Sequence, residues 1–589
     1  MRYAELANVY ESIQNTPKRL EKTLLISSLL KKTPDKELDM IFLLIEGKIF
    51  HYWQKLKLGV AAKTVVKAIS IATGISFDNI EKEWRNYGDL GLVAEKLISQ
   101  KIQTTLFSSE LTVAKVYSNI SKLGSFEGTG TVDRKVKLLA ELLTSAKPLE
   151  AKYIVRTALE DLRVGVGEGL LRDSIVWAFF KEELGLEYDR ESNKLLLPDN
   201  KRQKYDEYVN AVQYALNIKN DFAQVSKIAK SDGLEGLVNV KITMGKPMKT
   251  MLFQKAKNIE EAFEIVGLPA AFEYKYDGFR VQVHFDRGSV LLFTRRQEDV
   301  TAQFPDVVKS IKENINADSA ILDTEIVGFN PKTNQYVPFQ NISQRIKRKY
   351  DIEKIRKEFP VEVNVFDIMF LNGENKLELP FQNRRKLISE ILEPKEREIV
   401  LSRIIVTDKK EEASVFYNEA LDRGEEGVMA KNLQASYKPG SRVGYGVKIK
   451  PVMESLELVI VKAEWGEGKR ATWLTSFTLA ARSDEGLLEV GKVSTGFKEL
   501  EGEGVTFNRM TELLRPLILA EKGKEVRVKP EVVIEVSYEE VQSSPTYSSG
   551  YALRFPRFLR IREERAVDDI DDLETIGKLY KGQRNREKI

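Results

Sequence analysis

The spacing of apolar residues changes twice along the chain. In the first stretch, up to about residue 238, apolar positions recur every three or four residues, which is the spacing of an α-helix with one buried face. The segment EAKYIVRTALEDLRVG, residues 150–165, shows it clearly. Its basic residues Lys152, Arg156 and Arg163 share the face opposite the apolar one. We therefore expect an all-α domain over residues 1–238.

Near residue 240 the helical spacing gives way to alternation. The segment FEYKYDGFRVQVHFDRGSVLLFTRR, residues 272–296, alternates in twos and predicts β-strands. Its breaks at Asp277-Gly278 and Arg287-Gly288 predict turns between antiparallel strands. Further strand-like runs alternate with helical stretches such as RRKLISEIL. This pattern indicates an α+β domain over residues 239–450.

After Pro451 the pattern is mostly that of short strands, for example LELVIVKAEW, SFTLAARS and VVIEVSYEEV. Roughly 140 residues of this kind are typical of a small β-barrel such as an oligonucleotide-binding fold. We therefore expect a barrel domain over residues 451–589, ending in a polar tail.

Composition limits the chemistry available to the chain. The 589 residues hold 92 basic and 88 acidic side chains, no cysteine and two histidines. Disulfides, thiolate metal sites and cysteine nucleophiles are excluded, and a histidine-based triad is disfavoured. Any catalytic chemistry should rest on Lys, Arg, Asp and Glu. With no apolar run long enough to span a membrane and no secretory signal pattern, we expect a cytoplasmic protein.

The tetrapeptide Lys275-Tyr276-Asp277-Gly278 ends the first predicted strand of the α+β domain. A lysine is a nucleophile only as the free amine, which neighbouring cations or an apolar pocket favour. Alone, this motif is most often a surface turn. An ordered set of further motifs follows it: Thr294-Arg295-Arg296, Leu322-Asp323-Thr324-Glu325, Phe366-Asp367, Glu426-Gly427-Val428-Met429-Ala430-Lys431 and Lys448-Ile449-Lys450.

In this order and spacing the motifs resemble those of the covalent nucleotidyltransferase superfamily, which contains ATP-dependent DNA ligases, RNA ligases and capping enzymes. The helical region resembles the DNA-binding domain of archaeal and eukaryotic replicative DNA ligases, and ALRFPRFLRIREER resembles the last family motif. There the family shows Arg-x-Asp-Lys, whereas this chain has Arg562-Glu563-Glu564-Arg565, and Thr250 replaces a usual proline. The resemblance implies a nucleotidyltransferase domain of ATP-grasp-like antiparallel sheets between the helical domain and the barrel.

The resemblance also implies a role for each motif residue. Lys275 would carry AMP, Lys448 and Lys450 would hold the α-phosphate, and Glu426 would ligate the divalent metal, Mg²⁺ or Mn²⁺. Further residues would bind ATP, through the adenine, the ribose or the phosphates: Glu273, Arg280, Arg295, Glu325, Phe366 and Arg442. Glu325 would bind ribose or metal. Taken singly, Phe366 would more often be a core residue, and each of these charged residues an ordinary surface residue.

The implied reaction has three steps and seals nicks in duplex DNA during replication, repair and recombination. The lysine attacks the α-phosphate of ATP, the 5′-phosphate of a nick takes the AMP, and the 3′-hydroxyl displaces it. Rival interpretations are an RNA ligase or capping enzyme with the same core, and a non-catalytic DNA-binding protein with a degenerate nucleotide site. An NAD-dependent ligase is disfavoured because its usual zinc site needs four cysteines.

A short segment of the helical region resembles a sliding-clamp binding box. It runs Gln103-Thr104-Thr105-Leu106-Phe107, so that Gln103 precedes a hydrophobic plug of Leu106 and Phe107. A helix end or a plain loop is an equally good interpretation. We expect a monomer that acts on nicked duplex DNA, with the clamp as a possible partner.

Overall fold

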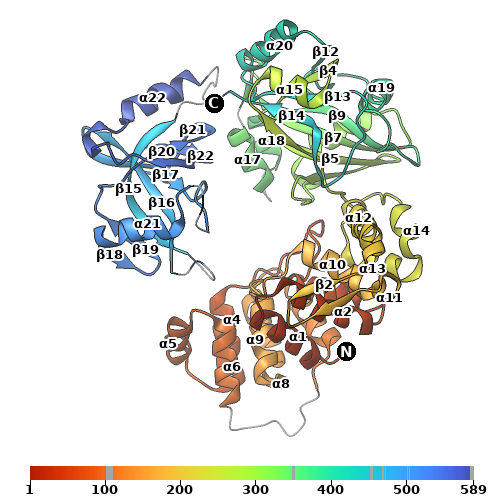
Figure 1. Ribbon diagram of the computed structural model, residues 1–589, viewed down its shortest axis with the longest axis vertical. Helices are drawn as coiled ribbons and strands as arrows, with labels where there is room; N and C mark the ends of the chain where they lie inside the picture. Colours follow the sequence, from red (N-terminus) through yellow and green to blue (C-terminus); the bar gives the residue numbers. More distant parts are fainter. Residues whose placement is uncertain are drawn as a thin grey trace.

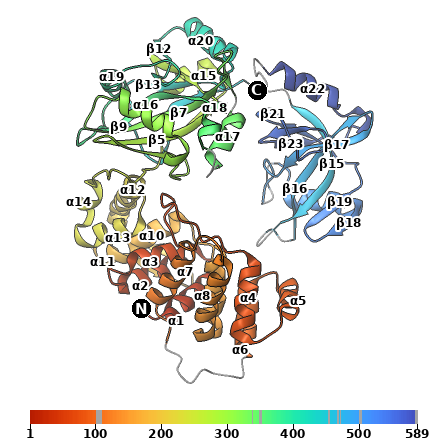
Figure 2. The same cartoon turned by 180° about the vertical axis from the view of Figure 1, so that it is seen from behind.

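The computed structural model describes residues 1–100, 110–337, 339–347, 352–451, 455–466, 470, 472–499, 502 and 504–583. The clamp-box residues Gln103, Leu106 and Phe107 lie outside the described residues. Figure 1 shows three bodies arranged in an arc, with the N-terminal helices below, the central domain above and the strand-rich C-terminal domain beside it. Figure 2 shows the same arrangement from behind.

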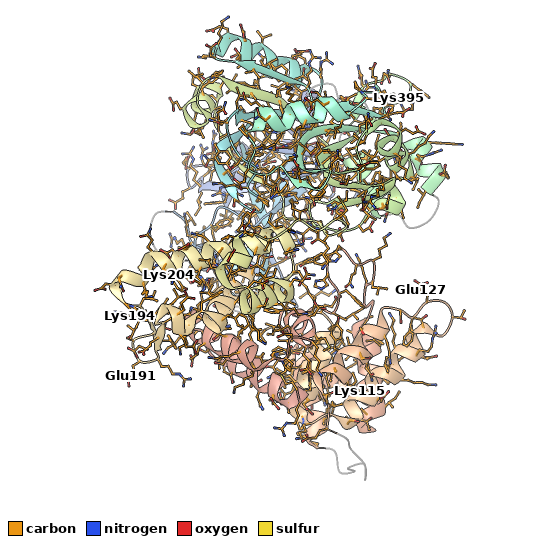
Figure 3. The ribbon with its side chains drawn as sticks, turned by 90° about the vertical axis from the view of Figure 1, so that its right-hand side faces the viewer. Lys115, Glu127, Glu191, Lys194, Lys204 and Lys395 are labelled. Carbon is orange, nitrogen blue, oxygen red and sulfur yellow. The ribbon has the colours of Figure 1, made fainter. Side chains whose placement is uncertain are left out.

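The N-terminal body is helical, with one short hairpin. Its elements are α1 (Tyr3–Asn15), α2 (Arg19–Lys32), α3 (Leu38–Ile45), α4 (Ala62–Thr73), α5 (Phe77–Tyr87), α6 (Leu90–Ser99), α7 (Val113–Leu123), α8 (Thr131–Ser145), α9 (Pro148–Ala158), α10 (Glu168–Phe179), α11 (Lys181–Leu184), the hairpin of β1 (Glu187–Asp189) and β2 (Lys194–Leu196), α12 (Arg202–Lys219), α13 (Phe222–Ser231) and α14 (Gly233–Val238). Charged side chains, among them Lys115, Lys194 and Lys204, project from its surface in Figure 3.

Helix α9 shows what the sequence pattern missed. Its apolar face is buried as expected, but the opposite face is buried too. Lys152 Nζ lies 2.6 Å from Glu11 Oε2, and Arg156 Nη2 lies 2.6 Å from Asp89 Oδ2. Asp89 also caps α6 by accepting a hydrogen bond from the Gly91 amide. Because each cation has a partner on another helix, a polar face can be buried in the centre of this domain.

The central domain holds two sheets with helices packed on them. Its elements are β3 (Leu252–Ala256), α15 (Ile259–Val266), β4 (Ala270–Lys275), β5 (Phe279–Asp286), β6 (Ser289–Thr294), α16 (Pro305–Asn314), β7 (Ser319–Phe329), β8 (Tyr336–Val337), α17 (Phe339–Lys347), α18 (Ile352–Glu358), β9 (Val361–Leu371), β10 (Glu374–Asn375), α19 (Phe381–Ile391), β11 (Ile399–Leu401), β12 (Ile404–Thr407), α20 (Lys410–Asp422), β13 (Gly427–Asn432) and β14 (Arg442–Ile449).

The two sheets have different strand orders. The larger runs β10-β9-β7-β5-β6, with β11 paired to β9 and β8 to β7, and the smaller runs β12-β4-β13-β14-β3. The turn at Arg287-Gly288 joins antiparallel neighbours, as predicted. The prediction for Asp277-Gly278 is wrong, because β4 pairs with β12 and β13 while β5 pairs with β6 and β7. This turn therefore carries the chain from one sheet to the other.

The C-terminal domain is built mainly of strands. Its elements are β15 (Leu456–Trp465), β16 (Leu474–Ser483), β17 (Gly486–Val493), α21 (Phe507–Leu514), β18 (Ile518–Lys522), β19 (Glu525–Val528), β20 (Val533–Ser537), β21 (Glu540–Ser543), β22 (Tyr551–Arg554), β23 (Arg557–Ile561) and α22 (Leu573–Gly582). Strand β15 pairs with β16 along one edge and with β20 and then β19 along the other. The apolar side chains of these strands form a separate core. This strand-rich architecture agrees with the expected barrel.

Candidate active site

The lysines of the motifs meet a carboxylate at one end of the smaller sheet. Lys275 ends β4, Glu426 directly precedes β13, and Lys450 directly follows β14, where β4, β13 and β14 are adjacent strands. Glu426 forms an ion pair with Lys275, and its Oε2 lies 2.6 Å from Lys450 Nζ. The antiparallel register places Gly427 opposite Lys275 and Met429 opposite Lys448. Neighbouring strand ends thus gather three lysines around one acid.

Electrostatics in this cluster follow from burial and from the lysines. Burial alone would raise the pKa of Glu426, but the ammonium groups of Lys275 and Lys450 outweigh it and hold that pKa well below its usual range. Burial lowers the pKa of Lys448, and the positive charges of Lys275 and Lys450 lower it further. Glu426 is therefore a carboxylate at neutral pH. The lysines around it, Lys275, Lys448 and Lys450, provide the positive charge that bound phosphate groups require.

Glu325 approaches the same cluster from β7 of the larger sheet, opposite Arg280 on β5. Burial raises the pKa of Glu325 to about 8, although Lys275 and Arg280 act in the opposite direction. Burial disfavours the anionic form of this carboxyl group, and a bound cation would stabilise that form. Glu325 and Glu426 together offer the oxygen donors that Mg²⁺ prefers, so the residues present fit a divalent metal ion.

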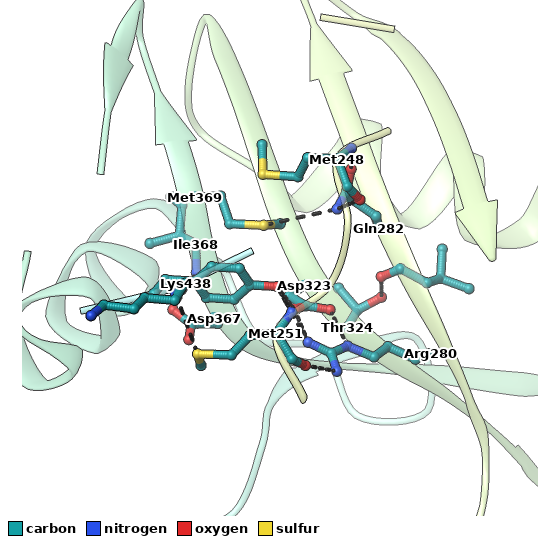
Figure 4. Close-up of polar contacts among 12 residues, drawn as sticks. Met248, Met251, Arg280, Gln282, Asp323, Thr324, Asp367, Ile368, Met369 and Lys438 are labelled. Carbon is teal, nitrogen blue, oxygen red and sulfur yellow. Dashed lines mark hydrogen bonds and ion pairs between the residues drawn. The ribbon is translucent and has the colours of Figure 1, made fainter. Parts of the chain in front are cut away.

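Arg280 is fixed by an acid for which the sequence analysis assigned no role. Its Nε lies 2.8 Å from Asp323 Oδ1, its second terminal nitrogen also pairs with Asp323, and its first donates to the Met251 carbonyl at 2.7 Å (Figure 4). Tyr437 donates to Asp323 Oδ2 at 2.7 Å. Asp323 precedes Glu325 by two residues on β7, and this alternation is the signal that could have identified it.

An aromatic ring and a second acid lie beside Arg280. The guanidinium carbon of Arg280 is 5.4 Å from the centre of the Phe366 ring, and Lys431 Nζ is 5.0 Å from it. Lys431 also pairs with the buried carboxylate of Glu273, which accepts a hydrogen bond from Ser402 Oγ at 3.0 Å. Phe366 is half-buried, which distinguishes it from a fully buried core residue. Glu273, Arg280 and Phe366 therefore lie near one another, with Lys431 between Glu273 and the Phe366 ring.

Two of the residues expected to bind the nucleotide lie outside this cluster. Arg295 follows the end of β6 and Arg442 begins β14, six residues before Lys448. Both side chains are exposed, and within the described part of the chain neither forms an ion pair. Their contact with the nucleotide stays a prediction.

The C-terminal domain reaches this site with two acids to which the sequence analysis gave no role, Glu539 and Glu540, and with Arg554 from the segment that resembles the last family motif. Glu539 Oε2 lies 3.0 Å from Lys450 Nζ, and Arg554 lies 2.9 Å from Glu540 and 3.9 Å from both Asp277 and Glu426. A cavity of about 740 Å³ lies between the two domains. Its walls include these basic residues: Lys450, Arg554, Arg557 and Lys578.

Glu425 is a further buried acid that the sequence analysis did not single out. It accepts a hydrogen bond from the Asp277 amide at 3.1 Å, and burial raises its pKa well above the ordinary value. Arg565, which departs from the family pattern, lies on the C-terminal domain with its Nε 2.9 Å from Glu457 Oε2. In this arrangement Arg565 is tied to its own domain.

Comparison with known families agrees with this geometry. The family model for the ATP dependent DNA ligase domain matches residues 250–450, which contain the whole cluster of acids and lysines. The models for the DNA ligase N terminus and for the ATP dependent DNA ligase C terminal region match residues 2–176 and 470–565. The chain belongs to the ATP-dependent DNA ligase family.

Relatives of known name extend the match over the full length. A DNA ligase from Nanoarchaeum equitans is 47% identical over 588 residues, which cover 99% of each chain. A DNA ligase from Thermococcus fumicolans is 41% identical over 587 residues, or 98% of each chain. This ligase therefore uses ATP and seals nicks in DNA.

A solved structure of similar architecture is Pmar-Lig_Pre, with a TM-score of 0.52 at 15% sequence identity. The alignment covers 94% of this chain and 98% of that one, and at this identity it speaks for the fold alone. Among the described residues of this ligase, none of the helices has the length and apolar character needed to cross a membrane.

Proposed function

We propose that Lys275 is the residue that carries AMP. The observation that supports this assignment most strongly is the meeting of Lys275, Lys448, Lys450 and Glu426 at adjacent strand ends. Lys275 supplies the nucleophile, and the other two lysines supply fixed positive charge for the α-phosphate. Fixed charges of this kind stabilise the negative charge that develops during phosphoryl transfer without reorganising during the step.

The adenosine would lie against the wall formed by Phe366, Arg280 and Glu273. An aromatic face stacks on a base with about 1–3 kcal/mol of binding energy. Glu273 would accept a hydrogen bond from the adenine amino group, once the base displaces part of its present bonding to Lys431. Arg280, held in one orientation by Asp323, would reach the ribose or the phosphates. Arg295 and Arg442 would add contacts from the exposed strand ends.

The phosphate chain would run from Lys275 toward the cavity between the central and C-terminal domains. Glu325 and Glu426 would hold the divalent metal, with Mg²⁺ or Mn²⁺ as the expected ion. The metal would neutralise phosphate charge. Arg554 and Arg557 line the same cavity and would orient the departing pyrophosphate.

In the full reaction Lys275 Nζ forms a bond to the α-phosphorus of ATP, and the bond to pyrophosphate breaks. The 5′-phosphate of the nick then displaces Lys275 from AMP, and the 3′-hydroxyl displaces AMP to close the strand. The helical domain and the C-terminal domain would hold the duplex mainly through its phosphates, so binding should weaken strongly with salt. We place this activity in DNA replication, repair and recombination.

Labelling with [α-³²P]ATP tests the assignment of Lys275. The Lys275→Ala variant should stay folded, because Lys450 remains as a partner for Glu426. It should lose the labelled enzyme and nick sealing together, whereas Lys312→Ala, an exposed change on α16, should keep both. A labelled enzyme formed by Lys275→Ala at the rate of the unchanged protein would refute the assignment.

Parallel reactions separate the rival functions. A capping enzyme would be labelled by GTP, and an RNA ligase would prefer nicked RNA to nicked DNA. We expect labelling by ATP and sealing of nicked DNA. We also expect a monomer, and size-exclusion chromatography with light scattering checks this expectation. A pull-down with a sliding clamp, using variants of Gln103, Leu106 and Phe107, tests the clamp box.

A further inference from the structure

Three side chains of the N-terminal domain converge at a point remote in sequence from the adenylation motifs. Asp39 lies on α3, His51 lies in the turn after it, and Asp221 lies between α12 and α13. Their nearest ligand atoms all lie within 4.8 Å of one another, and His51 Nε2 is 3.2 Å from Asp39 Oδ1. Within the described part of the chain, this is the one group of three or more such residues at this spacing.

The three groups are held in place by their surroundings. The His51 ring stacks on Trp53 with ring centres 4.4 Å apart. Asp221 is buried and its Oδ1 accepts a hydrogen bond from the Gln224 amide at 2.9 Å. Helices α3 and α13 pack together, as Figure 2 shows, with the Phe42 and Phe222 rings stacked between them.

A small cavity of about 40 Å³ opens on the three residues. Asn220 also lines it, and the side-chain nitrogen of Asn220 is buried with no hydrogen-bond partner among the described residues. An amide can be placed in two orientations that exchange its nitrogen and oxygen. Turned the other way, Asn220 would present a carbonyl oxygen to the cavity. A buried amide group without a hydrogen-bond partner needs an explanation, and a water molecule or an ion in the cavity would supply one.

We propose that Asp39, His51 and Asp221 form a binding site for a divalent transition-metal ion of the zinc class. One imidazole and two carboxylates are a donor set that zinc accepts, at about 2.0–2.2 Å from each ligand atom. The ligand atoms would have to close on the ion by about 1 Å, and water or Asn220 would complete the coordination. The imidazole separates this site from the all-oxygen site at Glu325 and Glu426, which suits Mg²⁺.

Positive side chains lie near the site, and a metal ion would have to displace one of them to bind. Lys246 Nζ lies 3.2 Å from Asp221 Oδ2, and Lys227 and Lys246 both act on the charge of Asp39. A bound ion would replace Lys246 as the cation next to Asp221. Lys246 is partly exposed, so its flexible side chain can move toward solvent.

The site lies at the junction of two domains. Gln297 of the central domain lines the same cavity, and the segment after His51 pairs with that domain through Lys55–Asp299 at 3.4 Å and Lys57–Glu298 at 3.7 Å. A metal ion bound to His51 would anchor this segment to α3 and to the α12–α13 turn. The ion would therefore stiffen the junction between the DNA-binding and adenylation domains.

The presence of two histidines in the chain makes the test direct. His51 and His284 give two imidazole signals in the NMR spectrum of the full-length ligase labelled with [¹³Cε1]histidine. His284 is buried in the central domain, where its Nδ1 accepts a hydrogen bond from the Gly245 amide, and it serves as an internal control. We expect one equivalent of Zn²⁺, added in excess Mg²⁺, to shift the His51 signal and leave that of His284 unchanged.

Variants then measure the contribution of each ligand. His51→Gln assigns the signal, and Asp39→Asn should weaken Zn²⁺ binding by at least about tenfold. Asp133→Asn, at an exposed carboxylate on α8, is the matched control and should bind like the unchanged protein. An unmoved His51 signal, a shift of both histidine signals, or equal affinity of Asp39→Asn and Asp133→Asn would each overturn the proposal. An unchanged melting temperature verifies that each variant is folded.

Discussion

Replacing Asp323 with alanine should damage both the stability of the central domain and the binding of ATP. Asp323 is fully buried and is the acid partner of the Arg280 guanidinium. Burial alone would lower the pKa of Arg280, and the charge of Asp323 reverses that effect and raises it. Without the acid, Arg280 remains buried as an uncompensated cation and Tyr437 loses its acceptor.

The size of the effect follows from these contacts. Breaking a buried ion pair by removing one partner costs about 3–5 kcal/mol, because the remaining charge stays desolvated. In a domain of about 200 residues, 1 kcal/mol moves the melting temperature by about 2–4 °C. The Asp323→Ala change should therefore lower the melting temperature of this domain by about 6–20 °C.

A double variant separates structure from function. Removing Arg280 together with Asp323 also removes the buried charge, so Arg280→Ala/Asp323→Ala should recover much of the lost stability. It should not recover adenylation, because the proposed contact of Arg280 with the nucleotide is gone. Calorimetry gives the melting temperatures, and labelling with [α-³²P]ATP at several ATP concentrations gives the KM.

Asp318→Asn is the matched control, since this exposed acid precedes the same strand. The reasoning fails if Asp323→Ala melts within about 2 °C of this control. It also fails if the double variant is adenylated at the normal rate. In that case Arg280 would be a structural residue without contact to ATP.

Three further results are expected. In Gly278→Ala the new Cβ would lie 2.3 Å from a carbonyl oxygen of β7, so labelling by ATP should be nearly lost. Gly288→Ala meets no atom within 4 Å; its positive φ of 81° strains alanine at this turn, but the site is untouched and labelling should be retained. Arg554→Ala should slow adenylation by about tenfold, since it removes a cation worth about 1.4 kcal/mol at the phosphate cavity, and burst kinetics check this. Burial raises but Arg384 lowers the pKa of Asp367, and the net shift is downward. The Asp367–Arg384 pair thus stabilises the fold at neutral pH, and this stabilisation is lost as the pH falls below about 4. The urea concentration at the midpoint of unfolding should therefore be lower for Asp367→Asn than for the unchanged protein at neutral pH, and the two values should converge in acid.

The local pattern of apolar and polar residues determined the secondary-structure class of each region of this protein. Helical spacing, alternation and the shift near residue 240 are properties of neighbouring residues, and they predicted a helical region, a mixed region and a strand-rich region. The resemblance of the motifs to those of the nucleotidyltransferase superfamily assigned Lys275, Glu426 and Lys450 to one site, and in the structure each lies at or next to the end of a strand. The pairing of β4, β13 and β14, which are far apart in sequence, brings these strand ends together, and this pairing belongs to the tertiary structure.

Partners distant in sequence were decided by the tertiary structure alone. The pattern gave Lys152 and Arg156 a polar face, but only the packing of α1 and α6 on α9 supplies the acids that allow that face to be buried. The turn at Gly278 resembles a hairpin locally, yet the pairing of β4 and β5 in different sheets makes it a crossing. Asp39, His51 and Asp221 are likewise separated by up to 182 residues, so no spacing in the sequence could have placed them together. Periodicity reports which side of an element is buried, whereas the choice of neighbour depends on the free energy of the whole packed chain.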